Sequence, residues 1–399
     1  MSEDSQQSWT GKLGKSLGGV VFGFLLFLAS FVVLFWNEGR TVRAAKDIAE
    51  GAANTVSVKA GKVDPANEGK LVHLTGKMCC GEKLTDPKYG VSANAVKLKR
   101  NVEMYQWKEE KKDKSVTYSK VWSATWIDSS KFEQKDGHVN LPGMPESSWQ
   151  ATAQNVTVGD FAVSQGLLSQ ANDFKTISEA QKQAKAPKPV DFQTVTGWDF
   201  DMKTTDGGFS FSAKKAAPGA TPVAGTPAAV SAEPQIGDWR MIFQAVPVDT
   251  EVSLIAQQKG NSFEPYKTKE GNTLEVLKIG NHTAAQMYAA MSSSNNTLKW
   301  ILRIAGFVMM FLGLGLVAGP LNVLADAIPF VGTIVGGITG LVAFLIALPL
   351  TLVTIGVAWV YYRPVVGIAI IAIAAVILAL GIVLKTKKAR ARRLAKANT

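Results

Sequence analysis

Long uninterrupted runs of apolar residues are the strongest pattern along this 399-residue chain. The first run, residues 17–36, carries no charge and as a helix would span about 30 Å, enough to cross the hydrocarbon core of a bilayer. It is too long for a typical signal-peptide core and no A-x-A cleavage site follows, so we predict an uncleaved membrane helix. Further runs predict spans at 300–321, 331–360 and 365–384, with an interfacial loop at 322–330 between the first two.

Basic residues after the last run set the predicted orientation. The segment 385–399 contains no acid and carries Lys385, Lys387, Lys388, Arg390, Arg392, Arg393 and Lys396. The positive-inside rule places this basic tail in the cytoplasm, and four spans then place residues 1–16 there too. Attraction to anionic lipid headgroups is a second interpretation of the same tail. An aromatic belt at the opposite interface fits this orientation, with Trp36, Trp300, Trp359, Tyr361 and Tyr362, and Arg303 would extend to that interface.

The segment 37–298 is therefore predicted to form one large extracytoplasmic domain. Alternating apolar and polar positions predict strands at 70–78, 95–106, 116–128 and 239–248. Residues 216–234 are rich in Ala, Pro, Gly and Thr and predict a flexible insertion. The predicted fold class is a multi-pass α-helical membrane protein with four transmembrane helices and a β-rich α+β extracytoplasmic domain.

Glycines recur at four-residue spacing in the apolar runs. The pairs and triplet are Gly19 and Gly23, Gly315 and Gly319, and Gly332, Gly336 and Gly340. Small residues at this spacing let helix backbones approach closely in lipid, either between two chains or within one bundle. Pro349 can kink the third span, and Asp326 is the one acid of the C-terminal membrane region. These two residues are the candidates for a channel function.

Charge and composition exclude several other functions. The formal net charge is +11, of which the basic tail supplies +7 and residues 37–298 only about +2, so no nucleic-acid-binding face is predicted. Cys79 and Cys80 are adjacent, and the three histidines show no metal-ligand spacing. We find no catalytic motif and predict neither an enzyme nor a cofactor or metal site. Three N-x-T sequons are open to glycosylation in a eukaryotic lumen, at Asn155, Asn281 and Asn295.

Several short motifs occur in an order that resembles the LUMA family of four-pass membrane proteins (transmembrane protein 43). They are NEGR at 37–40, NEGK at 67–70, DPKYGV at 86–91, VKLKR at 96–100, VEMYQW at 102–107, GDWR at 237–240 and YRP at 362–364. The resemblance implies cytoplasmic termini and one large luminal domain. It implies no enzymatic activity and therefore no catalytic residue.

The resemblance also implies where such a protein acts. Animal members are placed in the ER and the inner nuclear membrane, where they self-associate and help organise envelope proteins, including emerin and lamins. The low cysteine count and the alanine-rich insertion suit a bacterial member in the inner membrane, for which the lamin link would not transfer. The leading hypothesis is a self-associating membrane organiser that binds membrane-protein or lipid partners. The alternative is an ion-conducting or channel-regulating subunit.

Overall fold

The computed structural model describes residues 9–112, 115–188, 199–214, 233–319 and 331–369. The chain divides into two compact units. The helical unit comprises the residues up to 53, the hairpin tip 268–272 and the residues from 288 onward. The β unit comprises residues 54–267 and 273–287.

In the described part of the helical unit there are three long helices, α1 (Trp9–Asn54), α5 (Ala284–Val317) and α7 (Val331–Tyr362). Each is long and apolar enough to cross a bilayer, so the prediction of a membrane protein is confirmed. The fourth predicted span, 365–384, lies mostly outside the described residues, and a count of four helices stays a prediction. Helix α1 does not end at Trp36 but continues unbroken to Asn54.

The three helices pack through a small apolar core. Leu34 of α1, Met310 of α5 and Ala347 of α7 are fully buried at its centre. Phenylalanines surround them, and the Phe307 and Phe344 rings meet edge to face at 5.8 Å. The outward positions of the same helices stay exposed, including Val32 and Leu345. Buried and exposed residues are equally apolar, as is typical of helices surrounded by lipid.

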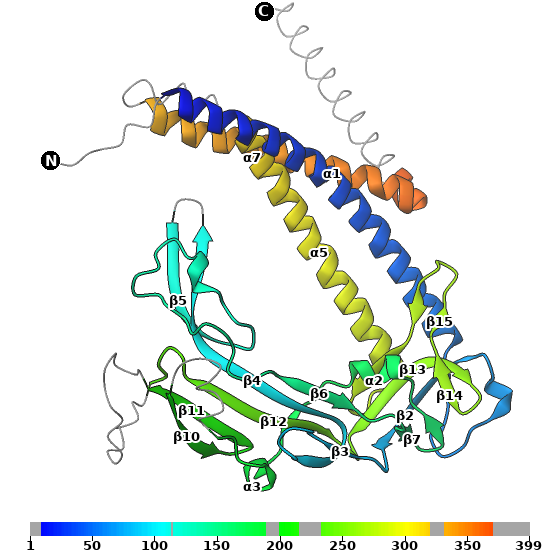
Figure 1. Ribbon diagram of the computed structural model, residues 1–399. Coiled ribbons are helices and arrows are strands. Elements are labelled where there is room, and N and C mark those ends of the chain that lie inside the picture. Colours follow the sequence, from blue (N-terminus) through cyan, green and yellow to red (C-terminus); the bar gives the residue numbers. More distant parts are fainter. Residues whose placement is uncertain (1–8, 113–114, 189–198, 215–232, 320–330, 370–399) are drawn as a thin grey trace, which may run out of the picture. The chain divides into compact units, whose positions relative to one another are not determined.

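Two larger sheets form most of the β unit, so the prediction of a β-rich region is confirmed (Figure 1). The first has the order β14 (Ser262–Glu264), β13 (Glu251–Lys259), β2 (Leu71–Cys79), β7 (Thr157–Val158) and β8 (Phe161–Ala162). In addition, β1 (Val56–Ser57) pairs in parallel with β2, and β17 (Val276–Ile279) pairs with β13. The second has the order β10 (Asp199–Thr205), β11 (Gly208–Lys214), β12 (Trp239–Pro247), β4 (Ser92–Lys112) and β3 (Lys83–Thr85). Strands β5 (Ser115–Ser123) and β6 (Trp149–Thr152) also pair with β4, and β9 (Lys175–Thr176) pairs with β12.

Short elements complete the β unit. They are the hairpin of β15 (Tyr266–Lys267) and β16 (Thr273–Leu274), the helices α2 (Gln165–Gln170) and α3 (Ala180–Gln183), and single 3-10 turns at Pro65–Asn67 and Ser129–Lys131. The predicted strand 116–128 is too long at its end, because β5 stops at Ser123, whereas strand β12 shows why the period-two pattern predicts strands. Trp239, Met241 and Phe243 are buried, whereas the intervening Arg240 and Ile242 are only half-buried. The predicted insertion 216–234 lies almost entirely outside the described residues.

Candidate functional site

Four consecutive residues of α1, Asn37-Glu38-Gly39-Arg40, meet α5 and α7 in the helical unit. We call these residues and their partners on α5 and α7 the polar junction. Asn37 and Glu38 are buried although both are polar, and the segment lies just beyond the uncharged run of α1. Buried polar groups need partners because an unpaired one loses its hydration without compensation. The partners come from residues more than 250 positions away in the sequence.

Glu38 is the centre of the polar junction. Arg303 of α5 donates to both of its carboxylate oxygens, from Nε to Oε1 at 2.7 Å and from Nη2 to Oε2 at 2.9 Å. Trp359 of α7 donates its indole N–H to Oε2 at 2.9 Å. The Arg303 guanidinium also lies over the ring of Trp300, 4.9 Å from the centroid. One carboxylate therefore joins all three helices through charge-assisted hydrogen bonds.

Arg303 corrects an expectation from the sequence. We expected its side chain to extend to the membrane interface, but it is only 11% exposed because Glu38 holds it between the helices. Neither Glu38 nor Arg303 was predicted as a site residue. The available signal was an acid just beyond the end of one apolar run and a base about one turn inside the start of another, where an unpaired charge is costly.

Asn37 and Arg40 extend the polar junction along α5. The Asn37 side-chain amide donates to the carbonyl oxygen of Lys299 at 3.1 Å. Arg40 donates from Nη1 to Oδ1 of Asn295 at 3.0 Å, and Asn295 in turn donates to the carbonyl oxygen of Thr41 at 3.1 Å. Asn295 thus acts as a linker between two helices, within a sequon that the structure places inside α5.

Gly39 completes the motif by its lack of a side chain. A Cβ atom at this position would lie 2.5 Å from Cζ of Tyr362, so the tyrosine ring packs directly on the backbone of α1. The four residues of NEGR therefore have four separate structural roles. This explains in physical terms why these residue types stand together here.

The predicted glycines divide into two groups. Gly23 lies in the contact between α1 and α5, where a Cβ would meet the Gly313 carbonyl oxygen at 2.8 Å. At Gly19, Gly315 and Gly340, no atom of the described residues lies within 4 Å of an added Cβ. The sequence pattern missed Gly313 and Gly306, which pack on α1 at Phe27 and Leu34. The four-residue spacing of glycines along one helix does not show which face of that helix packs against another helix.

The remaining predicted residues are less informative. Gly332 and Gly336 belong to α7, but their surroundings are not described, and Gly319 lies two residues after α5. Pro349 lies inside α7, which continues through it. Asp326 and the basic tail, Lys385 to Lys396, lie outside the described residues. A channel role for Asp326 and Pro349 therefore stays a prediction.

The DPKYGV motif forms a second buried polar cluster, inside the β unit. Asp86 accepts two hydrogen bonds from Nη1 of Arg100, at 2.9 and 2.8 Å, and also accepts the backbone N–H groups of Lys88 and Tyr89. Arg100 donates to the Ser147 carbonyl oxygen, and its other end lies 3.9 Å from Glu146. This cluster fixes the turn between β3 and β4, where Gly90 adopts a positive φ of 72°.

Glu146 is held ionised in this cluster. Burial alone would raise the pKa of its carboxyl, but hydrogen bonds from Lys88, Tyr89 and the Ser147 N–H outweigh burial and lower the pKa below its ordinary value. The pKa of Tyr89 is raised, first by burial and then by its hydrogen bond to Glu146 at 2.6 Å. Such a network stabilises the fold, and all its members are engaged with one another.

Among the described residues, no group of three or more His, Cys, Asp or Glu side chains could hold a metal ion. Cys79 and Cys80 are both free thiols. The other two sequons lie in the β unit, where the Asn155 amide donates to Glu82 and the Asn281 amide donates to Glu251.

Comparison with known proteins identifies the family. The sequence profile described as Transmembrane protein 43 matches residues 104–364, about two thirds of the chain. The chain belongs to the transmembrane protein 43 family. Proteins of this name from Mus musculus and Homo sapiens are 33% and 34% identical over 91% and 90% of this chain and 89% and 88% of their own lengths. A Drosophila melanogaster homolog is 26% identical over 87% of the chain. No solved structure matches the chain.

Membership of the transmembrane protein 43 family confirms the resemblance inferred from the motifs. Residues 37–40 of the polar junction precede the profile match at 104–364, whereas their partners on α5 and α7 lie within it, and the matches to the mouse and human proteins cover about nine tenths of the chain.

Proposed function

We propose that this member of the transmembrane protein 43 family is a self-associating organiser of its membrane. In this proposal the helices assemble with those of further copies, and the β unit binds membrane-protein or lipid partners outside the cytoplasm. Both termini face the cytoplasm, in the ER or inner nuclear membrane of a eukaryote or the inner membrane of a bacterium. The charge of the basic tail supports this orientation.

One observation carries the proposal of self-association. Gly23 and Gly313 are used within the chain, whereas no described residue fills the space beside Gly19, Gly315 and Gly340. A helix of a second chain can approach closely at such positions, because no side chain holds it away. Exposed residues near these glycines, such as Phe22 and Leu341, would add apolar contact.

The oligomeric state in lipid tests the proposal. The full chain would be placed in nanodiscs at limiting density and its mass distribution measured, together with crosslinking in native membranes. We expect the triple variant G19L/G315L/G340L to weaken association by about tenfold or more, which is about 1.4 kcal/mol. The control V21L changes an exposed position of α1 without filling a glycine gap and should associate as the wild type does. A strictly monomeric wild type would contradict the proposal.

The channel alternative is tested separately by ion flux into liposomes that contain the purified protein. Flux that Asp326→Asn abolishes would favour a conducting subunit over an organiser. In the described helices, Glu38 and Arg303 are paired with each other and do not line an open path. An orientation test would complete the comparison, with cysteine labelling of the two termini from either side of sealed vesicles.

A further inference from the structure

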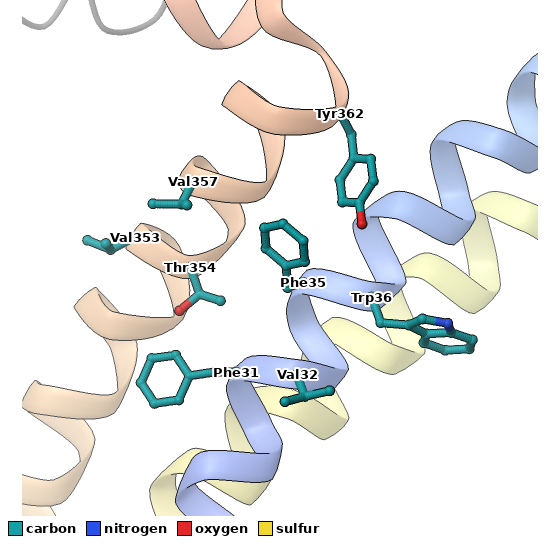
Figure 2. A pocket seen from close by; sticks show the side chains of 8 residues that line it. All are labelled: Phe31, Val32, Phe35, Trp36, Val353, Thr354, Val357 and Tyr362. Carbon is teal, nitrogen blue, oxygen red and sulfur yellow. The ribbon is translucent and has the colours of Figure 1, made fainter.

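A groove of about 650 Å³ lies between α1 and α7 within the helical unit (Figure 2). Its size falls within the range of small-molecule sites. Its walls are apolar apart from one indole N–H and two hydroxyl groups, and they are formed by Phe31, Val32, Phe35 and Trp36 of α1 and Val353, Thr354, Val357 and Tyr362 of α7. In Figure 2 the Phe31, Phe35 and Tyr362 rings and the Thr354 side chain lie in the space between the two helices.

The bilayer decides what can fill this groove. Both helices are candidate membrane spans, and the groove lies along their apolar segments. Val32, Val353 and Val357 are each more than half exposed, so the groove opens toward the surroundings of the bundle. In hydrocarbon those surroundings are lipid, and an empty groove would forfeit dispersion contacts along its walls. A lipid is therefore the expected class of occupant.

The walls favour a rigid lipid over a flexible chain. They are made of aromatic rings and β-branched valines, which have few accessible rotamers. The rings also hold one another, with centroids of Phe35 and Tyr362 5.2 Å apart and those of Tyr361 and Tyr362 4.8 Å apart. A fused-ring molecule loses little conformational entropy on entering such a preformed site, whereas an acyl chain loses much more.

The polar groups of the groove match a molecule with a single hydroxyl group. Thr354 already donates to the carbonyl oxygen of Leu350 at 2.7 Å. The Tyr362 hydroxyl makes no hydrogen bond within the described part of the chain. It lies beside Gly39 at the polar junction, the end of the groove closest to the polar residues of α1. A ligand would thus have its polar end at Tyr362 and its apolar body along Val357 and Val353.

The sequence of α7 gives an independent indication. Val357, Tyr361 and Arg363 fit the order V-x₃-Y-x-R, one form of a short pattern proposed for sterol contact. Alone this pattern is weak. Here the same segment supplies two walls of the groove, Val357 and Tyr362, and ends in the exposed cation Arg363.

We propose that the groove between α1 and α7 is a sterol-binding site. The sterol hydroxyl hydrogen-bonds to the Tyr362 hydroxyl, its fused rings pack against Phe35 and Val357, and its tail extends toward Phe31 and Val353. This inference goes beyond the organiser function and does not depend on it, because a monomer has the complete groove.

Photolabelling of the full chain tests the proposal. The protein would be placed in phosphatidylcholine nanodiscs that contain a small fraction of a diazirine-bearing cholesterol analogue, irradiated, and the labelled peptides mapped. We expect saturable labelling of 31–36 and 353–362 that excess cholesterol suppresses. Val357→Phe fills the groove and should reduce labelling about tenfold. Tyr362→Phe removes one hydrogen bond and should weaken binding about three- to tenfold.

Matched variants keep the test decisive. Val342→Phe adds the same bulk at another exposed position of α7 outside the groove and should label as the wild type does. Val32→Phe fills the groove from α1 and replaces Val357→Phe if that variant misfolds. Labelling that is non-saturable, or equal in V357F and V342F, would overturn the proposal. Labelling of the same residues by a photoreactive phosphatidylcholine in competition with the sterol probe would also overturn it and would indicate an acyl chain in the groove. The absence of any labelling would overturn it as well and would indicate that protein covers the groove.

Discussion

The polar junction of the helical unit and the Asp86 cluster of the β unit solve the same problem differently. Each buries an arginine against a carboxylate. Asp86 takes its partners from within 14 residues, so its pairing is local to one turn. Glu38 takes its partners from α5 and α7, 265 and 321 residues away. The first cluster shapes a loop, whereas the second holds together three helices that have little hydrophobic drive to associate in lipid.

Removing the charge of Glu38 should have the largest effect. Glu38→Gln leaves Arg303 buried without a counter-charge, and we expect a loss of about 3–5 kcal/mol in the free energy of unfolding. The measurement is reversible unfolding of the full chain in mixed micelles, followed by tryptophan fluorescence. Arg303→Met and the double variant complete a mutant cycle. Additive losses in that cycle would show that the two side chains do not act as a pair.

Helix contact at glycine should have an intermediate effect, and α5 offers a matched pair two residues apart. Gly313→Ala places a Cβ 2.7 Å from the backbone nitrogen of Phe27, so the backbone of α1 must move away. We expect the free energy of unfolding to fall by about 1–3 kcal/mol. Gly315→Ala meets no atom within 4 Å and should leave stability nearly unchanged. The same unfolding experiment measures both variants. Helix propensity favours alanine equally in both variants, so an equal change in stability at the two positions would show that contact with α1 does not decide the result.

The smallest expected effect is the pH dependence of the β unit. The pKa of Glu146 is lower when folded than when unfolded, so the stability it contributes is present above the unfolded value near 4.5 and is lost as pH falls through the folded value. We expect the unfolding free energy to fall by about 1 kcal/mol more in the wild type than in Glu146→Gln as pH decreases from 5.5 to 3. Hydrogen exchange of the strands around residue 146 would report it. Parallel pH profiles would contradict the assignment.

Much of the fold could be predicted from the sequence because its signals are local. Lipid-length apolar runs gave α1, α5 and α7, and alternation gave β2, β4 and β12. The end of β5 was missed: it stops at Ser123, and Trp126 turns to donate its N–H to the Leu141 carbonyl oxygen at 2.8 Å. Nothing in a period-two pattern marks the point where a side chain leaves the sheet to find a partner.

The candidate site was harder to predict because its contacts are distant in sequence. The NEGR motif stands out in the sequence, but the sequence predicts its partners Arg303 and Trp359 as residues of the membrane interface. Several helix packings are compatible with the same apolar runs, and each would pair different residues. The groove beside α7 likewise depends on two helices being neighbours, so only its sequence pattern was available beforehand.

The four-residue polar junction has a mechanical consequence for α1. Consecutive helix positions are about 100° apart, so residues 37–40 point around the whole circumference of the helix. Turning α1 about its axis by one position would separate Glu38 from Arg303 and bring a side chain into the space that Tyr362 fills at Gly39. Axial twisting and piston-like sliding of this helix are therefore blocked at the polar junction. A movement of α1 that keeps these contacts must carry α5 and α7 with it at this level.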